Sequence, residues 1–368
     1  MSAPTQDELL TVSGEQLELW YTRCPVPTAF SVAIANGWLD DAFAGRPIRL
    51  RSLADATDAA TRGSHFTQQQ RHLLRHGGNV PPLIARSRGA DVRLIGLSWP
   101  TFYEPLLVLP DAGIETVADL RGRRVSAPRR LGEPVDFWRA TSLHGVERAL
   151  ATGGLTLDDV ELVDVPVDRR YFAAPGRRKD ARAPLSSALE LIGHQREEGV
   201  ALLTGRVDAV FSHASLAPNL QGFTGAVPLV DVGALPDRRL RVNNGVPQVF
   251  TVTGDLLDAH PDVVARILAE TFRVADWAPA NEARVRSIIA AEVGLADELV
   301  GLAYSDAVCS ELAVNLAEES LEGLRRQARW LLEQGFLDAE VDVDAFVDPR
   351  PLEQARALLA SERTLARA

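Results

Sequence analysis

Apolar positions along most of the chain form short strand-like runs, separated by longer stretches with helical spacing. The short runs predict strands at 17–22, 48–53, 92–97, 106–109, 160–165, 207–211, 227–232 and 248–252. Helical spacing predicts helices between Pro27 and Gly37, at 68–74, 137–150 and 185–203, and from 261 nearly to the end. Because strands alternate with helices before a helical tail, the pattern predicts an α/β protein with mostly parallel sheets and a helical C-terminal region.

The length of 368 residues exceeds what one compact core usually holds and favours two lobes. Residues 117–125 combine a helical turn, a glycine break and the start of a strand, which suits a crossing between lobes. We therefore predict a first lobe at 1–112, a second at 113–239, and a return to the first lobe with C-terminal helices at 240–368. Residues 169–184 are rich in Arg, Pro and Ala without periodicity, which predicts a loop or a lid.

Composition narrows the class of partner. The apolar fraction is 46% and the charged fraction 24%, as in globular proteins, and the formal charge of -11 argues against nucleic acid or an anionic membrane as main partner. No run reaches the roughly 18 apolar residues of a membrane span, and the N-terminus is polar and acidic rather than signal-like. Two cysteines fit a reducing compartment. We expect a cytoplasmic monomer.

Cys24 is the first candidate for chemistry. It follows the first predicted strand in the turn Cys24-Pro25-Val26-Pro27, and ligands of open α/β sheets collect at such carboxyl ends. A helix N-terminus just downstream would favour a thiolate through its macrodipole. A lone cysteine is more often a small buried apolar side chain, and this is the expectation for Cys309.

Three segments resemble the substrate-binding proteins for sulfonates, nitrate and thiamine precursors. They are the Pro-x-x-x-Ala pattern after the first strand, Asp-Leu-Arg-Gly-Arg-Arg-Val at 119–125 and Gly-Arg-Val-Asp-Ala at 205–209. The resemblance covers about 17–268. It implies a two-lobed periplasmic-binding-protein-like (type II) fold.

A narrower resemblance is to the hydroxybiphenyl-sulfinate desulfinase family of dibenzothiophene desulfurisation. It is carried by Cys-Pro-Val-Pro at 24–27, His-Phe-Thr at 65–67 and Arg-His-Gly-Gly-Asn-Val-Pro-Pro-Leu at 75–83. The resemblance implies an essential cysteine at Cys24, contacts from His65 and Arg75 to the cysteine or the sulfinate, and a backbone N–H role for Gly78. Arg23 departs from the family, where a small polar residue precedes the cysteine, and 99–104 also differs.

Those residue types suit a sulfinate. The planar fork of Arg75 matches two oxygens, and the Gly77-Gly78 turn lets backbone N–H groups approach an oxyanion, although the glycine pair alone could simply end a helix. The candidates for an aromatic wall at the substrate, with inter-lobe packing as the alternative, are Trp99, Phe102, Tyr103 and Phe211. The remaining histidines lack metal-ligand spacing, so a zinc site is not expected. The chemistry that the resemblance implies requires neither a metal nor an organic cofactor.

The resemblance implies a cofactor-independent, cysteine-dependent desulfinase that releases sulfite from a small aromatic anion, a 2-hydroxyaryl sulfinate. Two alternatives stay open at this point. One is a solute-binding protein for a sulfonate-like anion. The other is a related thiol enzyme that acts on another small acid.

Overall fold

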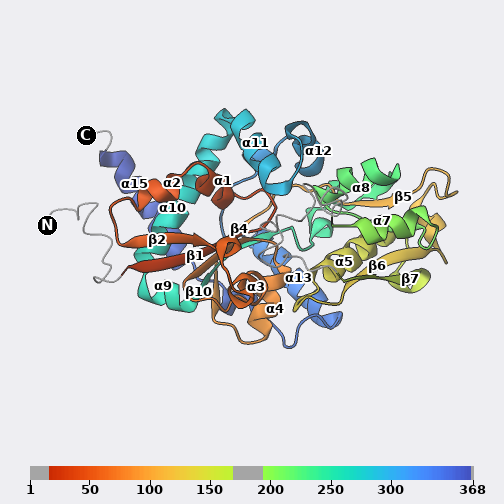
Figure 1. Ribbon diagram of the computed structural model, residues 1–368, viewed down its shortest axis with the longest axis horizontal. Coiled ribbons are helices and arrows are strands. Elements are labelled where there is room, and N and C mark those ends of the chain that lie inside the picture. Colours follow the sequence, from red (N-terminus) through yellow and green to blue (C-terminus); the bar gives the residue numbers. More distant parts are fainter. Residues whose placement is uncertain (1–15, 169–193, 366–368) are drawn as a thin grey trace, which may run out of the picture. The chain divides into compact units, whose positions relative to one another are not determined.

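The computed structural model describes residues 16–168 and 194–365, which form two compact α/β units (Figure 1). Unit 1 holds the chain up to Pro100, Pro247–Glu292 and the part from Cys309 onward, and unit 2 holds Thr101–Val246 and Val293–Val308. Within the described residues no helix has the length and apolar character needed to cross a membrane. The predicted lid at 169–184 lies outside the described residues.

Unit 1 is built on a five-stranded sheet. Its strand order is β2 (Ile48–Ser52), β1 (Leu17–Arg23), β3 (Leu73–Gly77), β10 (Gln248–Thr253) and β4 (Val92–Ser98). Strand β10 runs against the other four, so the prediction of mostly parallel strands holds with one exception in this sheet. Strands β3, β10 and β4 are almost fully buried, as expected for a sheet covered on both faces, whereas the edge strand β2 is only partly buried.

Helices cover this sheet on both sides (Figure 1). One group contains α1 (Ala29–Ala35), α2 (Trp38–Ala42) and α10 (Pro261–Trp277), and the other contains α3 (Ala59–Thr67) and α4 (Val80–Ser87). The helical C-terminal region predicted from the sequence is present. The further helices of unit 1 are α9 (Gly254–Ala259), α11 (Glu282–Val293, whose last residue falls in unit 2), α13 (Glu318–Glu333), α14 (Val343–Phe346) and α15 (Arg350–Leu365).

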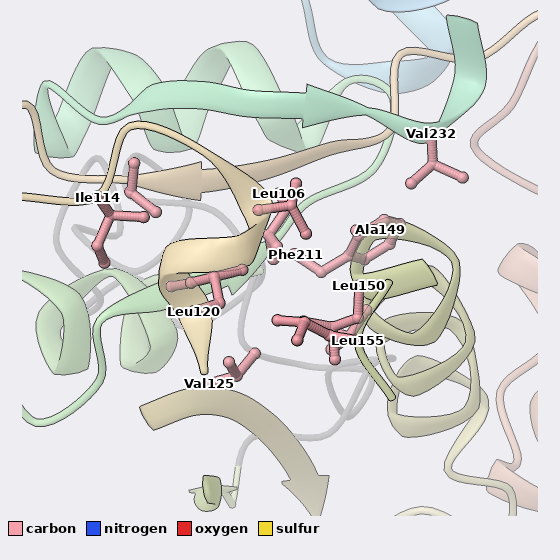
Figure 2. Packing of buried hydrophobic residues seen from close by; sticks show 13 residues of the cluster. Leu106, Ile114, Leu120, Val125, Ala149, Leu150, Leu155, Phe211 and Val232 are labelled. Atoms are coloured by element: carbon pink, nitrogen blue, oxygen red, sulfur yellow. The ribbon is translucent and has the colours of Figure 1, made fainter. Parts of the chain in front are cut away.

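Unit 2 has a second five-stranded sheet of the same kind. Its order is β7 (Glu161–Val167), β6 (Arg124–Arg130), β8 (Ala209–Phe211), β5 (Pro105–Val108) and β9 (Val227–Asp231), with β5 antiparallel to its neighbours. Among its described residues, the α-helices are α5 (Phe137–Ala151), α7 (Arg196–Leu203), α8 (Leu216–Thr224) and α12 (Val300–Tyr304). Apolar side chains from the sheet, α5 and the turn at Val117–Leu120 pack into one core (Figure 2).

The predicted lobe boundaries need correction. The first crossing comes at Thr101 rather than after 112, because β5 pairs with β8 and β9 of the second sheet. The return comes at Pro247 rather than 240, where β10 begins to pair with β3 and β4. The sequence also gave no sign that Val293–Val308, within the helical tail, belongs to unit 2.

The helix predicted at 68–74 is wrong. The chain there leaves α3 through Gln68 in the left-handed region, turns again at His72 (φ 53°), and enters β3 at Leu73. Strand β3 is buried along its whole length between β1 and β10, so tertiary pairing overrides the helical spacing of this short segment. The other predicted strands are confirmed to within two residues at either end. Of the helix predicted at 185–203, the described part forms α7.

Candidate active site

Strand register brings the key residues of unit 1 together. Parallel pairing of β1 with β3 sets Thr22 beside Arg75, and Arg23 beside His76. Side chains alternate along a strand, so Arg75 and Gly77 share one face of β3, next to the end of β1 from which Cys24 follows. The glycine pair predicted to stop a helix instead ends this strand, and α4 begins at Val80.

Cys24 lies in a tight turn between β1 and α1. The N–H of Val26 donates to the Cys24 carbonyl at 2.8 Å, and the side chain of Thr28 caps α1 by accepting from Ser31 N–H. Helix α1 therefore begins at Ala29, several residues beyond the cysteine. The expected influence of the helix macrodipole on Cys24 is not supported, because that effect is confined to the first turn.

Two polar side chains converge on the sulfur of Cys24. Arg75 Nη2 donates to Sγ at 3.1 Å, and His65 Nε2, from the last turn of α3, lies 3.8 Å from Sγ. All three side chains are almost fully buried, with 6% exposure at Cys24, 4% at His65 and 1% at Arg75. The three residues that the sequence singled out therefore meet at the sulfur atom of Cys24.

The neighbours of His65 fix its ring and its protonation. Its Nδ1 forms a hydrogen bond with Thr22 Oγ1 at 2.7 Å, and its ring meets Phe66 edge-on at 4.9 Å. Burial, aided by the positive charge of Arg75, holds the pKa of His65 well below its usual 6.5. The imidazole is therefore neutral at pH 7, which lets it exchange a proton with the thiol.

The two glycines have different structural roles. A Cβ at Gly77 would lie 2.2 Å from Cys24 Sγ, so only glycine leaves room for the sulfur at this position. Gly78 precedes Asn79, the N-cap of α4, and its carbonyl accepts from Arg75 Nη1 at 2.6 Å. This bond fixes the guanidinium through a second nitrogen, so that its other nitrogen points at the sulfur.

The predicted aromatic residues occupy different environments. Trp99 belongs to unit 1 and packs beside Gly323 of α13, while Phe102 and Tyr103 belong to unit 2. Phe102 is buried, and the Tyr103 hydroxyl donates to Gln221 at 3.2 Å. Phe211 lies in the core of unit 2 (Figure 2). Its ring fills the space beside Gly145. Phe211 therefore has a packing role, and its prediction as a substrate contact finds no support.

Two polar contacts near the cysteine, one of Thr22 and one of Arg23, were missed in the sequence. Thr22 is the partner of His65, and the alternation of β1 could have pointed to it, since it lies two positions before Cys24. Arg23 pairs with Glu292 of α11 at 3.1 Å, and Ser31 donates to the same carboxylate at 3.3 Å. Arg23 is thus tied to a helix some 270 residues later in the chain, a contact that no local pattern predicts.

The described residues contain no group of three or more His, Cys, Asp or Glu side chains placed to hold a metal ion. The site of Cys24, His65 and Arg75 offers a sulfur, a neutral imidazole and a fixed cation. These groups can give or take a proton and can bind a small anion.

Sequence comparison identifies enzymes and binding proteins among the relatives. The chain is 30% identical over 350 residues to 2'-hydroxybiphenyl-2-sulfinate desulfinase of Rhodococcus erythropolis, covering 90% of this chain and 91% of the relative. Residues 78–176 match the family described as NMT1/THI5 like. A putative aliphatic sulfonates-binding protein of Escherichia coli is 34% identical over 86 residues, 23% of this chain and 24% of that protein.

The similar solved structures also include both an enzyme and a binding protein. A mutant of the desulfurization enzyme DszB in complex with biphenyl-2-sulfinic acid matches 93% of this chain and 99% of its own, with a TM-score of 0.73 and 28% identity. The periplasmic aliphatic sulphonate binding protein SsuA from Escherichia coli matches 91% of this chain and 92% of its own, with a TM-score of 0.62 and 18% identity. The likeness to SsuA concerns the fold alone and confirms the predicted binding-protein architecture.

Proposed function

Because the chain belongs to the family of 2'-hydroxybiphenyl-2-sulfinate desulfinases, we propose that it releases sulfite at Cys24 from a biphenyl-2-sulfinate that carries a hydroxyl on its second ring. The observation that carries the proposal is the convergence of Arg75 and His65 on one buried sulfur. A protein that only binds an anion needs donors for its oxygens. It does not need a thiol held between a cation and a neutral imidazole.

In the proposed reaction, the Cys24 thiol gives its proton to the ring carbon that bears sulfur. The carbon–sulfur bond then breaks, sulfur dioxide leaves, and water converts it to hydrogen sulfite. The substrate named for the relatives carries its hydroxyl on the second ring, so the route requires protonation of a biphenyl ring carbon without help from a hydroxyl on the same ring. A thiolate attack on sulfur is the second route, but it would expel an aryl carbanion, which is a poor leaving group.

Each neighbour of the sulfur has a part in this route. Arg75 stabilises the thiolate that remains after the proton is given, and its planar fork suits the two sulfinate oxygens. His65, neutral at pH 7, returns a proton from water to the sulfur. The N–H of Gly78 is the proposed backbone donor to an oxyanion, next to the carbonyl that Arg75 holds. Trp99, which belongs to the same unit as Cys24, remains a proposed contact of the aryl group.

The test is sulfite release from 2'-hydroxybiphenyl-2-sulfinate by wild type and Cys24→Ser. The serine hydroxyl is a far weaker acid and nucleophile, so we expect a loss of at least about a thousandfold in kcat/KM. Cys309→Ser is the matched control, since Cys309 is also buried in unit 1 and, among the residues that the structure describes, no polar side chain lies within hydrogen-bonding distance of its sulfur. It should keep wild-type activity.

Two results would defeat the proposal. Sulfite release that persists in Cys24→Ser would remove the role of the thiol. Tight binding of the sulfinate by wild type without any turnover would instead favour a solute-binding protein.

A further inference from the structure

Unit 2 contains a second group of chemistry-bearing side chains, at the carboxyl edge of its own sheet. Glu104 directly precedes β5, and His213 follows the end of β8 by two residues. Because β5 runs antiparallel, its start lies at the same edge as the end of β8. Ligands of open α/β sheets bind at this edge. No spacing in the sequence pointed to either residue.

The two side chains form a carboxylate–imidazole pair. Glu104 Oε1 lies 2.8 Å from His213 Nδ1, and the Glu104 side chain is 1% exposed. A buried carboxylate beside Nδ1 holds the imidazole with its proton on that nitrogen, which leaves Nε2 as a basic acceptor. Nε2 has no partner among the described residues and the side chain keeps 10% exposure, so a bound molecule can reach it.

Backbone bonds hold this pair rigidly. Ser212 N–H donates to the Pro105 carbonyl at 2.9 Å, and Ala214 N–H donates to the Tyr103 carbonyl at 2.7 Å. His213 is thereby fixed from both sides opposite Glu104. Ala214 has a φ of 49°, a left-handed conformation that is unfavourable for alanine, and strained backbone of this kind clusters at functional sites.

Aromatic rings and a glycine surround the imidazole. The ring of Phe102 meets His213 edge-on at 4.9 Å, and that of Trp138 lies 6.4 Å away. A Cβ at Gly245 would lie 2.1 Å from the Phe102 ring and 2.8 Å from His213 Cε1, so a glycine is required for the backbone to approach. The surroundings of the free nitrogen are therefore apolar and aromatic.

The charges nearby indicate what kind of group binds. Asp231 accepts from Glu104 N–H at 2.9 Å, so two carboxyl groups lie at this edge of the sheet, and burial raises the pKa of Asp231. These carboxyl groups would repel an anionic ligand. A neutral hydrogen-bond donor on an aromatic ring satisfies both the basic Nε2 and the aromatic surroundings.

We propose that Glu104 and His213 form a binding site in unit 2 for an aromatic hydroxyl group, which donates its proton to His213 Nε2. Glu104 is a positioning residue that orients the imidazole. The choice of a phenol among neutral donors rests on the proposed function, in which the substrate carries such a hydroxyl. The site itself rests only on the residues of unit 2.

The test compares 2-phenylphenol with 2-methoxybiphenyl, which has the same rings but no hydroxyl proton. Isothermal titration calorimetry on the full chain should show about tenfold tighter binding of the phenol, as expected for one hydrogen bond to a basic acceptor. His213→Asn keeps a donor for Glu104 but removes Nε2, so the ratio should fall to about one. Glu104→Gln should lower the ratio less. Neither probe has a sulfinate, so the outcome does not depend on desulfination.

His72→Asn is the matched control, since His72 pairs with Asp255 at 3.7 Å in unit 1 and should leave the ratio unchanged. The phenol should also shift the ¹⁵N resonance of His213 Nε2, which a purely structural histidine would not show. Equal affinity of wild type for the two probes, no binding of either, or a preference retained in His213→Asn would overturn the assignment.

Discussion

Replacing Gly77 by alanine tests whether the position of the sulfur atom governs the proposed chemistry. The new Cβ would lie 2.2 Å from Cys24 Sγ and 2.4 Å from Cys24 Cβ, whereas ordinary contact begins near 3.4 Å. The sulfur must therefore move by about 1 Å, the difference between these distances, or the two strands must separate. Overpacking of this kind costs about 1–3 kcal/mol of stability.

The effect on catalysis should be larger than the effect on folding. A displacement of about 1 Å at a reacting atom can cost on the order of a hundredfold in rate. Moving Sγ also breaks its 3.1 Å bond from Arg75. We therefore expect kcat/KM for sulfite release to fall at least a hundredfold, while the protein still unfolds cooperatively at a somewhat lower Tm.

Gly63→Ala is the control for this substitution. Gly63 lies in α3, the same helix that carries His65, and a Cβ there has no neighbour within 4 Å. Alanine in a helix interior is favoured over glycine by about 1 kcal/mol, so this variant should be active and slightly more stable. If Gly77→Ala keeps kcat/KM within twofold of wild type, the tight packing around the sulfur does not matter for function and the reasoning fails.

Three other substitutions have defined outcomes. Arg75→Lys should lower kcat/KM about a hundredfold or more because an ammonium cannot reproduce the bidentate fork; unchanged kinetics would argue against sulfinate contact. Thr22→Val removes the partner of His65 Nδ1 and should lower kcat/KM about tenfold with little change in Tm. A pH–rate profile of this variant identical to that of wild type would contradict a positioning role for Thr22. Burial raises the pKa of Glu198 from 4.5 to about 7, so ionisation destabilises the fold as pH rises through this window. This group alone should make the free energy of unfolding of wild type about 3 kcal/mol smaller at pH 8 than at pH 4, and Glu198→Gln should abolish that loss in chemical unfolding. If the free energies of unfolding of wild type and Glu198→Gln change in parallel with pH, this account of Glu198 is refuted.

The sequence predicted most of the strands because each is a short apolar run bounded by turn residues. It failed at β3, where Leu73–Gly77 includes Arg75 and His76, two residues that do not look like a buried strand. These polar side chains are buried because they have partners elsewhere: Arg75 bonds to Cys24 and His76 to Ser98. Long-range hydrogen bonds of this kind leave no local pattern.

The same limit applies to the functional residues. Cys24, His65 and Arg75 were identified through the resemblance of three short segments, and periodicity alone would have assigned Arg75 to a helix. His213 was set aside because it has no metal-ligand spacing, and its partner Glu104 is 109 residues away. Phe211 was expected near a ligand because it ends a strand, but three residues are too few to tell which face of that strand is the core.

The architecture shared with a sulphonate binding protein does not by itself distinguish a carrier from an enzyme. The distinction lies in how this chain uses the carboxyl edge of its first sheet. Pairing of Thr22 with Arg75 places a guanidinium beside the turn after β1, and Gly77, two residues further along β3, clears the space that a sulfur atom needs. If another residue stood in place of Gly77 or Cys24, the guanidinium of Arg75 could still bind an anion. In the mechanism that we propose, the combination of glycine, cysteine and arginine holds a proton donor at the place where the anion reacts.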